Sequence, residues 1–156
     1  MNKNKLPDNF ILYEFDELES TMITLKEMAM EDAKIGTIVR AKKQNSGRGR
    51  HGREWVSPEG NLYFSFLRNA ESKKSENIFA PVFIVAVALA ETINSFSNNQ
   101  KDIKIKWPND ILISNLKLAG ILIENFVNNK DQYLLNIGIG INIISSPKQT
   151  IYPSTN

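Results

Sequence analysis

The chain has 156 residues, of which 42% are hydrophobic, so it is long enough and apolar enough to bury the core of one domain. Its 19 lysines and arginines nearly balance 17 aspartates and glutamates, and a net charge of +2 gives no general argument for nucleic-acid binding. The absence of cysteine excludes disulfides, thiol catalysis and cysteine-ligated zinc, and it agrees with a cytoplasmic location.

We expect neither a signal peptide nor a membrane span. Residues 1–10, MNKNKLPDNF, lack the apolar core of a signal peptide. The longest apolar run, 78–90, is interrupted by Pro81 and is shorter than the roughly 20 residues that cross a bilayer. This run therefore predicts a buried core helix.

The first half of the chain alternates strand and helix patterns. Its predicted short strands are 10–15, 37–43 and 61–67. Ser20 and Thr21 precede apolar positions that share one helix face, which predicts a helix over 22–33. At the start of this helix, a serine or threonine oxygen should accept a hydrogen bond from an unpaired backbone N–H. Gly36 should end the helix. A second, long amphipathic helix is predicted over about 78–96.

The second half of the chain changes to the two-residue period of strands. Ile103, Ile105 and Trp107 alternate with lysines, which predicts a half-buried strand. Three further strands are predicted between turn-like segments, at 110–114, 118–126 and 132–143. About seven strands with two main helices indicate an α+β domain with a mixed, largely antiparallel sheet, and we expect residues 1–156 to form one such domain.

One segment is both flexible and cationic. Gly47–Trp55, GRGRHGREW, holds three of the five arginines and the only histidine. Glycines let a backbone approach a ligand closely, and arginines supply planar donors that match carboxylates and phosphates. The pattern suits a mobile loop that folds over an anionic small molecule, and it is not a Walker A loop. A solvated turn or a weak RNA-binding segment fits the composition equally well, and we interpret His51 as filling the loop.

Three later segments are typical of ligand sites, although each also has an ordinary structural interpretation. They are KWPND at 106–110, KLAGILIE at 117–124 and GIGIN at 138–142. Asn109 and Asp110 lie at a strand edge or simply in a β-turn. Lys117 lies at the mouth of an apolar strand, where lysines are more often solvated. The alternating glycines mark close approach by a ligand, or a bulge. Trp55 and Trp107 are by themselves typical of core aromatics.

In this order, together with Ser20-Thr21 and Gln44, these segments closely resemble the motifs of biotin protein ligases. The resemblance runs from about residue 15 to residue 155. It implies the catalytic domain that these enzymes share with lipoate ligases, related to class II aminoacyl-tRNA synthetases. We also expect two domains of the family to be absent. One is the N-terminal helix-turn-helix of some members, and with it their DNA-binding role. The other is the usual small C-terminal β-barrel domain.

The activity that the resemblance implies is an ATP-dependent ligation in two steps. The carboxylate of biotin attacks the α-phosphate of ATP, which enters with Mg²⁺, and yields biotinyl-5′-AMP and pyrophosphate. A lysine of a biotin carboxyl carrier domain then attacks the mixed anhydride, and AMP leaves. The implied partner is that carrier domain, with no nucleic acid and no membrane, and the implied protein is a cytoplasmic monomer or side-by-side homodimer.

The resemblance also implies roles for individual residues. The residues that would bind biotin are Ser20, Thr21, Gln44, Arg48, Gly49, Arg50, Lys117, Gly120 and Gly138. The residues that would bind ATP and the adenylate are Arg48, Arg50, Trp55, Lys106, Trp107, Asn109 and Asn142. The residues that would carry the chemistry are Lys117, Arg48 and Asp110. No metal ligand is assigned directly, because Mg²⁺ would enter with ATP.

Several of these roles have a stated chemical purpose. Lys117 would stabilise the charge that develops between carboxylate and α-phosphate, and Asp110 would orient or deprotonate the acceptor lysine. The Gly-Arg segment would cover the adenylate and keep water from it. Gly120 and Gly138 would leave room for the apolar body of biotin, and Trp55 would stack on adenine. The chain departs from the family at Met22, where a small polar residue is usual.

Three alternatives remain open. The first is a lipoate–protein ligase, which preferential activation of lipoate would identify. The second is a module that holds biotin or its adenylate without transferring it. The third is a small RNA-binding protein that uses the Arg-Gly segment, for which a steep salt dependence of RNA affinity would be diagnostic.

Overall fold

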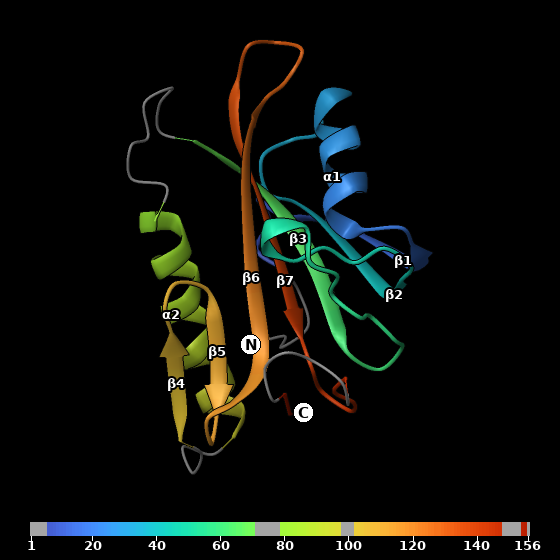
Figure 1. The fold of residues 1–156 in the computed structure, drawn as a ribbon. Helices are drawn as coiled ribbons and strands as arrows, with labels where there is room; N and C mark the ends of the chain where they lie inside the picture. The colour runs from blue at the N-terminus through green and yellow to red at the C-terminus, as the bar shows by residue number, and fades with distance from the viewer. Residues whose placement is uncertain (1–5, 71–78, 98–101, 148–153, 156) are drawn as a thin grey trace.

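The computed structural model describes residues 6–70, 79–97, 102–147 and 154–155, which form one seven-stranded sheet flanked by two helices (Figure 1). The strands are β1 Ile11–Leu18, β2 Thr37–Gln44, β3 Leu62–Asn69, β4 Ile103–Lys106, β5 Asp110–Ile113, β6 Leu116–Val127 and β7 Tyr133–Ile141. The helices are α1 Thr21–Met30 and α2 Phe79–Phe96. This arrangement confirms the predicted α+β class.

The sheet has the strand order β1-β2-β3-β7-β6-β5-β4. Among the described strands of the sheet, β1 and β2 pair in parallel through the crossover helix α1, and the other neighbouring pairs are antiparallel. The prediction of a mixed, largely antiparallel sheet is therefore confirmed.

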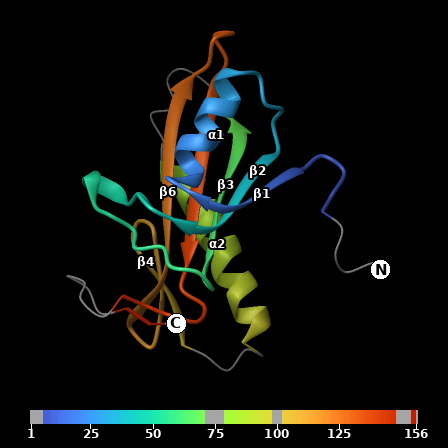
Figure 2. The same ribbon diagram turned by 90° about the vertical axis from the view of Figure 1, so that its right-hand side faces the viewer.

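The helices lie on opposite faces of the sheet. Helix α1 packs on β2, β3 and β7, and the turned view of Figure 2 shows it in front of these strands. Its core contains Leu25, Ala29, Val39, Leu67 and Leu134. Helix α2 packs on β4, β5 and β6, with a core of Ala86, Leu89, Ile111, Ala119, Ile121 and Ile139. Leu134 and Ile139 are an odd number of residues apart on β7, so their side chains point to opposite faces of the sheet. Each helix therefore has a core of its own.

The start of α1 is bonded differently from the prediction. Ser20 is the N-cap residue, but its side chain makes no capping hydrogen bond. Instead, the backbone N–H of Thr21 donates to Gln44 Oε1 at 2.8 Å. A side chain from the end of β2 therefore satisfies this orphan donor, which ties the helix to the sheet.

The end of α1 also corrects the prediction. The helix ends at Met30, because Asp32 takes a left-handed conformation with φ of 80°. The N–H of Ala33 then bonds to the carbonyl of Met28 at 2.9 Å, as in a Schellman motif. Gly36 instead lies in the connection to β2, where its own φ is 89° and an added Cβ would lie 2.2 Å from the Asn9 carbonyl oxygen.

Other boundaries differ by a few residues. The strand predicted over 10–15 continues to Leu18, and the one predicted to reach residue 143 ends at Ile141. Ile78, the predicted start of the second helix, lies outside the described residues, and the described helix begins at Phe79. Pro81 lies in the first described turn of α2.

Helix α1 is held at both ends by the β6–β7 hairpin. Asn136 on β7 donates from Nδ2 to the carbonyl of Met22 at 2.7 Å. At the other end, Asn129 in the β6–β7 turn donates to the carbonyl of Met30 at 3.0 Å, and Lys130 pairs with Asp32. The position of α1 over the sheet is thus defined by hydrogen bonds as well as by apolar packing.

Leu25→Ala should lower the free energy of unfolding by about 2–5 kcal/mol, because Leu25 is fully buried between α1 and the sheet. Urea denaturation measures this change. Ile84→Ala is the control, since Ile84 lies on α2 and is 70% exposed, and its effect should stay within about 0.5 kcal/mol. Equal effects of the two substitutions would contradict the packing described above.

Candidate functional site

The sheet carries a strip rich in glycine next to the start of α1. In the register of β6 and β7, Gly120 faces Gly140 and Leu122 faces Gly138. Residues that face each other across antiparallel strands point to the same side, here the side of α1. Three glycines on two neighbouring strands therefore leave a floor of bare backbone.

The Gly-Arg segment forms a paired structure above this floor. We call Gly47–Trp55 the Arg-Gly hairpin, because Trp55 N–H bonds to the Gly47 carbonyl at 2.8 Å and Gly49 N–H bonds to the Arg53 carbonyl at 2.7 Å. A single 3₁₀ turn, Arg50–Gly52, forms its tip. The predicted loop is thus a hydrogen-bonded hairpin in this structure, and the predicted filler His51 lies in the tip with φ of 57°.

The indole of Trp55 lies directly on the glycine floor. A Cβ at Gly140 would lie 2.5 Å from Trp55 Nε1, and one at Gly120 would lie 2.9 Å from Trp55 Cζ3. A Cβ at Gly138 would lie 2.6 Å from the sulfur of Met22. The close approach predicted from the glycines is therefore made by two side chains of the protein, and these occupy the space above the floor.

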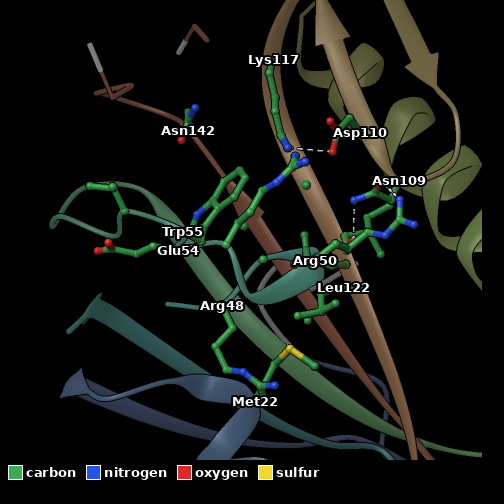
Figure 3. A pocket seen from close by; sticks show the side chains of 18 of the residues that line it. Met22, Arg48, Arg50, Glu54, Trp55, Asn109, Asp110, Lys117, Leu122 and Asn142 are labelled. Carbon is green, nitrogen blue, oxygen red and sulfur yellow. Dashed lines mark hydrogen bonds and ion pairs between the residues drawn. The ribbon is translucent and has the colours of Figure 1, made fainter. Parts of the chain in front are cut away.

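The hairpin, the floor, the start of α1 and the β4–β5 turn enclose a cavity of about 620 Å³ (Figure 3). Every site residue predicted from the sequence lines it. These are Ser20, Thr21, Gln44, Arg48, Gly49, Arg50, Trp55, Lys106, Trp107, Asn109, Asp110, Lys117, Gly120, Gly138 and Asn142. The structure therefore brings together segments that lie as far apart in the chain as Ser20 and Asn142.

One end of the cavity is cationic. Lys117 Nζ lies 2.8 Å from an oxygen of Asp110 and 5.2 Å from the centre of the Trp55 ring. The two charged side chains are only 23% and 16% exposed, so water screens their charges less than at the surface. Arg50 reaches from the hairpin tip and donates to Asn109 Oδ1 at 2.9 Å, beside this pair (Figure 3).

The opposite end, near Met22, holds a small polar network. Thr21 Oγ1 and Ser65 Oγ are 2.8 Å apart, and Gln44 Nε2 donates to Ser57 Oγ at 2.9 Å. Sequence reasoning missed both serines. Ser65 was detectable as a polar residue at an inward position of β3, where it is fully buried, whereas Ser57 lies in a loop without such a signal.

Two buried polar atoms of the cavity wall have neither a hydrogen-bond partner nor an ion-pair partner among the described residues. They are Trp55 Nε1 and Asn142 Oδ1. The amide nitrogen of Asn142 donates to the Thr155 carbonyl at 3.1 Å, which fixes the orientation of its side chain. Since buried polar atoms are normally paired, these two atoms are suited to contact a ligand.

A second arginine contact joins the hairpin to the sheet. Arg48 Nη2 and Nη1 donate to the two carboxylate oxygens of Glu124 at 2.6 and 3.2 Å. Glu124 lies on β6, on the same face as Gly120 and Leu122. The sequence offered no role for Glu124, although it ends the KLAGILIE motif.

The loop that follows the Arg-Gly hairpin is held by a hydrogen bond from β3. Tyr63 on β3 is buried, and its hydroxyl donates to the Pro58 carbonyl at 2.9 Å. Burial raises the pKa of Tyr63 above its ordinary value, so the phenol keeps its proton and remains a donor at neutral pH. This bond positions the segment that carries Ser57.

The described ranges contain neither a cluster of metal-ligating side chains nor a membrane-spanning helix. Within residues 6–70, 79–97, 102–147 and 154–155, no three histidine, aspartate or glutamate side chains gather closely enough to hold a metal ion. No helix in the same ranges is long and apolar enough to cross a membrane.

Gly140→Ala should displace the indole of Trp55, because the added methyl group would overlap it. We expect the tryptophan emission to shift to the red as the ring moves toward water. Gly52→Asn is the control, because a Cβ at Gly52 meets nothing within 4 Å and asparagine tolerates the left-handed φ of 70° at this position of the same hairpin. An unchanged emission maximum in Gly140→Ala would show that Trp55 does not lie on the floor.

Comparison with known sequences places these features in a family. The model of the biotin/lipoate A/B protein ligase family matches residues 14–142. The chain is 37% identical over 145 residues to the bifunctional ligase/repressor BirA of Bacillus subtilis, covering 93% of this chain and 44% of that protein. It is 34% identical over 109 residues to the biotin–[acetyl-CoA-carboxylase] ligase of Paracoccus denitrificans, covering 70% of this chain and 45% of that protein. The chain thus spans less than half the length of these curated relatives.

Solved structures agree with this assignment. The biotin protein ligase of Aquifex aeolicus in complex with biotin and ATP has a TM-score of 0.75 and 34% identity, covering 92% of this chain and 58% of that one. The Leishmania major enzyme in complex with biotinyl-5-AMP has a TM-score of 0.76 and 29% identity, covering 96% and 63%. The fold, the gathered motifs and the family match together show that the chain belongs to the biotin/lipoate A/B protein ligase family.

Proposed function

We propose that this chain activates biotin with ATP as biotinyl-5′-AMP and transfers the biotinyl group to a lysine of a biotin carboxyl carrier domain. The observation that carries the proposal is a single cavity with a small polar network at one end and two cationic side chains at the other. Relatives whose structures hold biotin with ATP, or biotinyl-5-AMP, support the assignment of these ligands.

The polar end suits the ureido group of biotin. In the Thr21–Ser65 hydroxyl pair one hydrogen is used in the mutual bond, so the other remains available to donate to a carbonyl. Gln44 is held by the Thr21 N–H and by Ser57, so its amide is already oriented before a ligand arrives. The neighbouring Met22 offers a thioether to the apolar part of the ring.

The cationic end suits the activation step. A carboxylate oxygen attacks the α-phosphorus, the bond to the bridging oxygen breaks, and pyrophosphate leaves with that electron pair. Two anions must meet for this step, so cations there stabilise the transition state. The Lys117 ammonium has three hydrogens, enough to donate to the carboxylate and the α-phosphate while it stays ion-paired with Asp110. Arg50 is the second cation within the same end.

The transfer step would use Asp110. The acceptor amine attacks the carbonyl carbon of the mixed anhydride, AMP leaves with the electrons of the broken C–O bond, and the nitrogen loses a proton. Asp110 lies beside Lys117 in the cavity wall, so its carboxylate can orient the amine and accept that proton. The ion pair means that Asp110 and Lys117 work as a couple, and changing either one affects both steps.

Magnesium would enter with ATP. The site offers Asn142 Oδ1, a buried neutral oxygen without a partner among the described residues, and hard oxygens of this kind suit Mg²⁺. The ion would offset the charge of the phosphates when bound. Asn109 is less suited, because its oxygen already accepts from Arg50 and its nitrogen donates to the Ile121 carbonyl.

The other inferences from the resemblance remain predictions. They include the contacts of Lys106, Trp107 and Gly49 with the nucleotide or biotin, the stacking of Trp55 on adenine, the cytoplasmic location, and the monomeric or side-by-side dimeric state. The RNA-binding alternative loses support, because Arg48 and Arg50 both bond to residues of their own sheet and its β4–β5 turn.

Mass spectrometry of a carrier domain incubated with this chain, biotin and Mg-ATP tests the proposal directly, with lipoate as a parallel substrate. A biotin-sized gain confined to one carrier lysine is the expected result. A gain with lipoate alone would identify a lipoate ligase. No gain, with biotin binding still measurable by calorimetry, would identify a module that binds without transfer.

Lys117→Ala should slow biotin-dependent exchange of pyrophosphate into ATP by roughly 10²–10³-fold, because it removes a cation from the transition state. Biotin affinity, measured by calorimetry, should fall much less. Lys104→Ala is the matched control, since Lys104 pairs with Asp102 on the surface of β4, and its rate should match the wild type. Equal losses of rate and affinity in Lys117→Ala would contradict a transition-state role.

A further inference from the structure

The carboxylate of Glu124 occupies both terminal nitrogens of Arg48. The two contacts, 2.6 and 3.2 Å, form the bidentate arrangement in which a guanidinium fork matches a carboxylate. Arg48 lines the cavity, whereas Glu124 lies on β6 beyond the cavity wall. The pair therefore joins the cover of the cavity to the sheet below it.

Arg48 is placed in the hairpin where such a joint restrains the whole element. It lies in the first strand of the Arg-Gly hairpin and pairs through its backbone with Glu54, next to Trp55. The tip of the hairpin has a separate tie, from Arg50 to Asn109. The two ties reach β6 and the β4–β5 turn, so together they hold the hairpin over the cavity from two sides.

We propose that Glu124 is a positioning residue, and that the Arg48–Glu124 pair is a strap that holds the Arg-Gly hairpin closed over the cavity. The proposal rests on the proposed function for the identity of the retained ligand, an acyl adenylate. In this arrangement both terminal nitrogens of the Arg48 guanidinium group are bonded to Glu124. The direct cationic contacts with the adenylate then come from Lys117 and Arg50, and Arg48 acts through the position of the hairpin.

The exposure of the strap makes it reversible. The side chains of Arg48 and Glu124 are 42% and 29% exposed, so dissolved salt screens their attraction. A substrate that enters or an adenylate that leaves needs the hairpin to open, and this pair can break without leaving a fully buried charge. The rate of opening should therefore increase with ionic strength.

The first test needs no substrate. Amide hydrogen exchange by NMR follows the N–H groups of Gly49 and Trp55, both bonded within the hairpin. In Glu124→Gln these two amides should exchange about two- to fivefold faster, as expected for loss of a partly exposed ion pair. The exchange rate of the Leu25 amide in α1 should stay unchanged. Glu14→Gln is the matched control, because Glu14 forms the same kind of pair with Arg40 on the sheet away from the hairpin. Equal exchange in the two variants overturns the strap.

The second test separates a strap from direct ligand contact. The release rate of adenylate formed in the site is measured for Arg48→Ala, Glu124→Ala and the double variant. The strap predicts equal acceleration in all three, and a rise with salt in the wild type that the variants lack. A much larger effect of Arg48→Ala, or additive effects in the double variant, overturns it. If the wild type forms no adenylate, the proposed function fails, whereas hydrogen exchange still decides the strap.

Discussion

The site depends on one close approach, that of the Trp55 indole to a strip of backbone without side chains. Because Gly120 and Gly140 face each other on β6 and β7, the ring can lie flat against the sheet. Trp55 also ends the Arg-Gly hairpin, so this contact sets the height of the hairpin above the sheet. The depth of the cavity, and the reach of Arg50 to Asn109, follow from that height.

Hydrophobic periodicity was enough to predict the elements and the fold class but not the strand order, and local chemistry accounts for the errors at the element boundaries. The strands and helices were predicted because their apolar residues repeat at the period of the element that buries them. Helix α1 ends early because Asp32, which is not a glycine, takes the left-handed conformation that the prediction assigned to Gly36. Its first N–H is satisfied by Gln44, a side chain 23 residues away, and no local pattern announces such a partner.

The residues that line the cavity were predictable, but their pairings were not. The resemblance predicted which side chains would contact the ligands, and all of them line one cavity, although their roles stay predictions. The Arg48–Glu124 bond joins positions 76 residues apart, and the Thr21–Ser65 bond joins positions 44 residues apart. Such contacts depend on the register in which β3, β6 and β7 pair. A shift of one strand by two residues keeps the same side chains on the same face, so the hydrophobic pattern does not determine this register. The same reason hid the packing of Met22 on Gly138.

The anchoring of α1 at both ends has a consequence for how a ligand is selected. Asn136 holds the helix at the carbonyl of Met22, and Asn129 with Lys130 holds it at Met30 and Asp32. The start of α1 is therefore held in place, and this wall of the cavity is the one that would receive the ring of the proposed acid substrate. Binding there would not be improved by movement of the helix. Little conformational entropy is lost on that side when a well-matched ring binds, whereas a ring of the wrong size meets a surface that does not yield. Under the proposed function, discrimination between acids would depend on shape at the fixed wall, and adaptation would be left to the Arg-Gly hairpin opposite it.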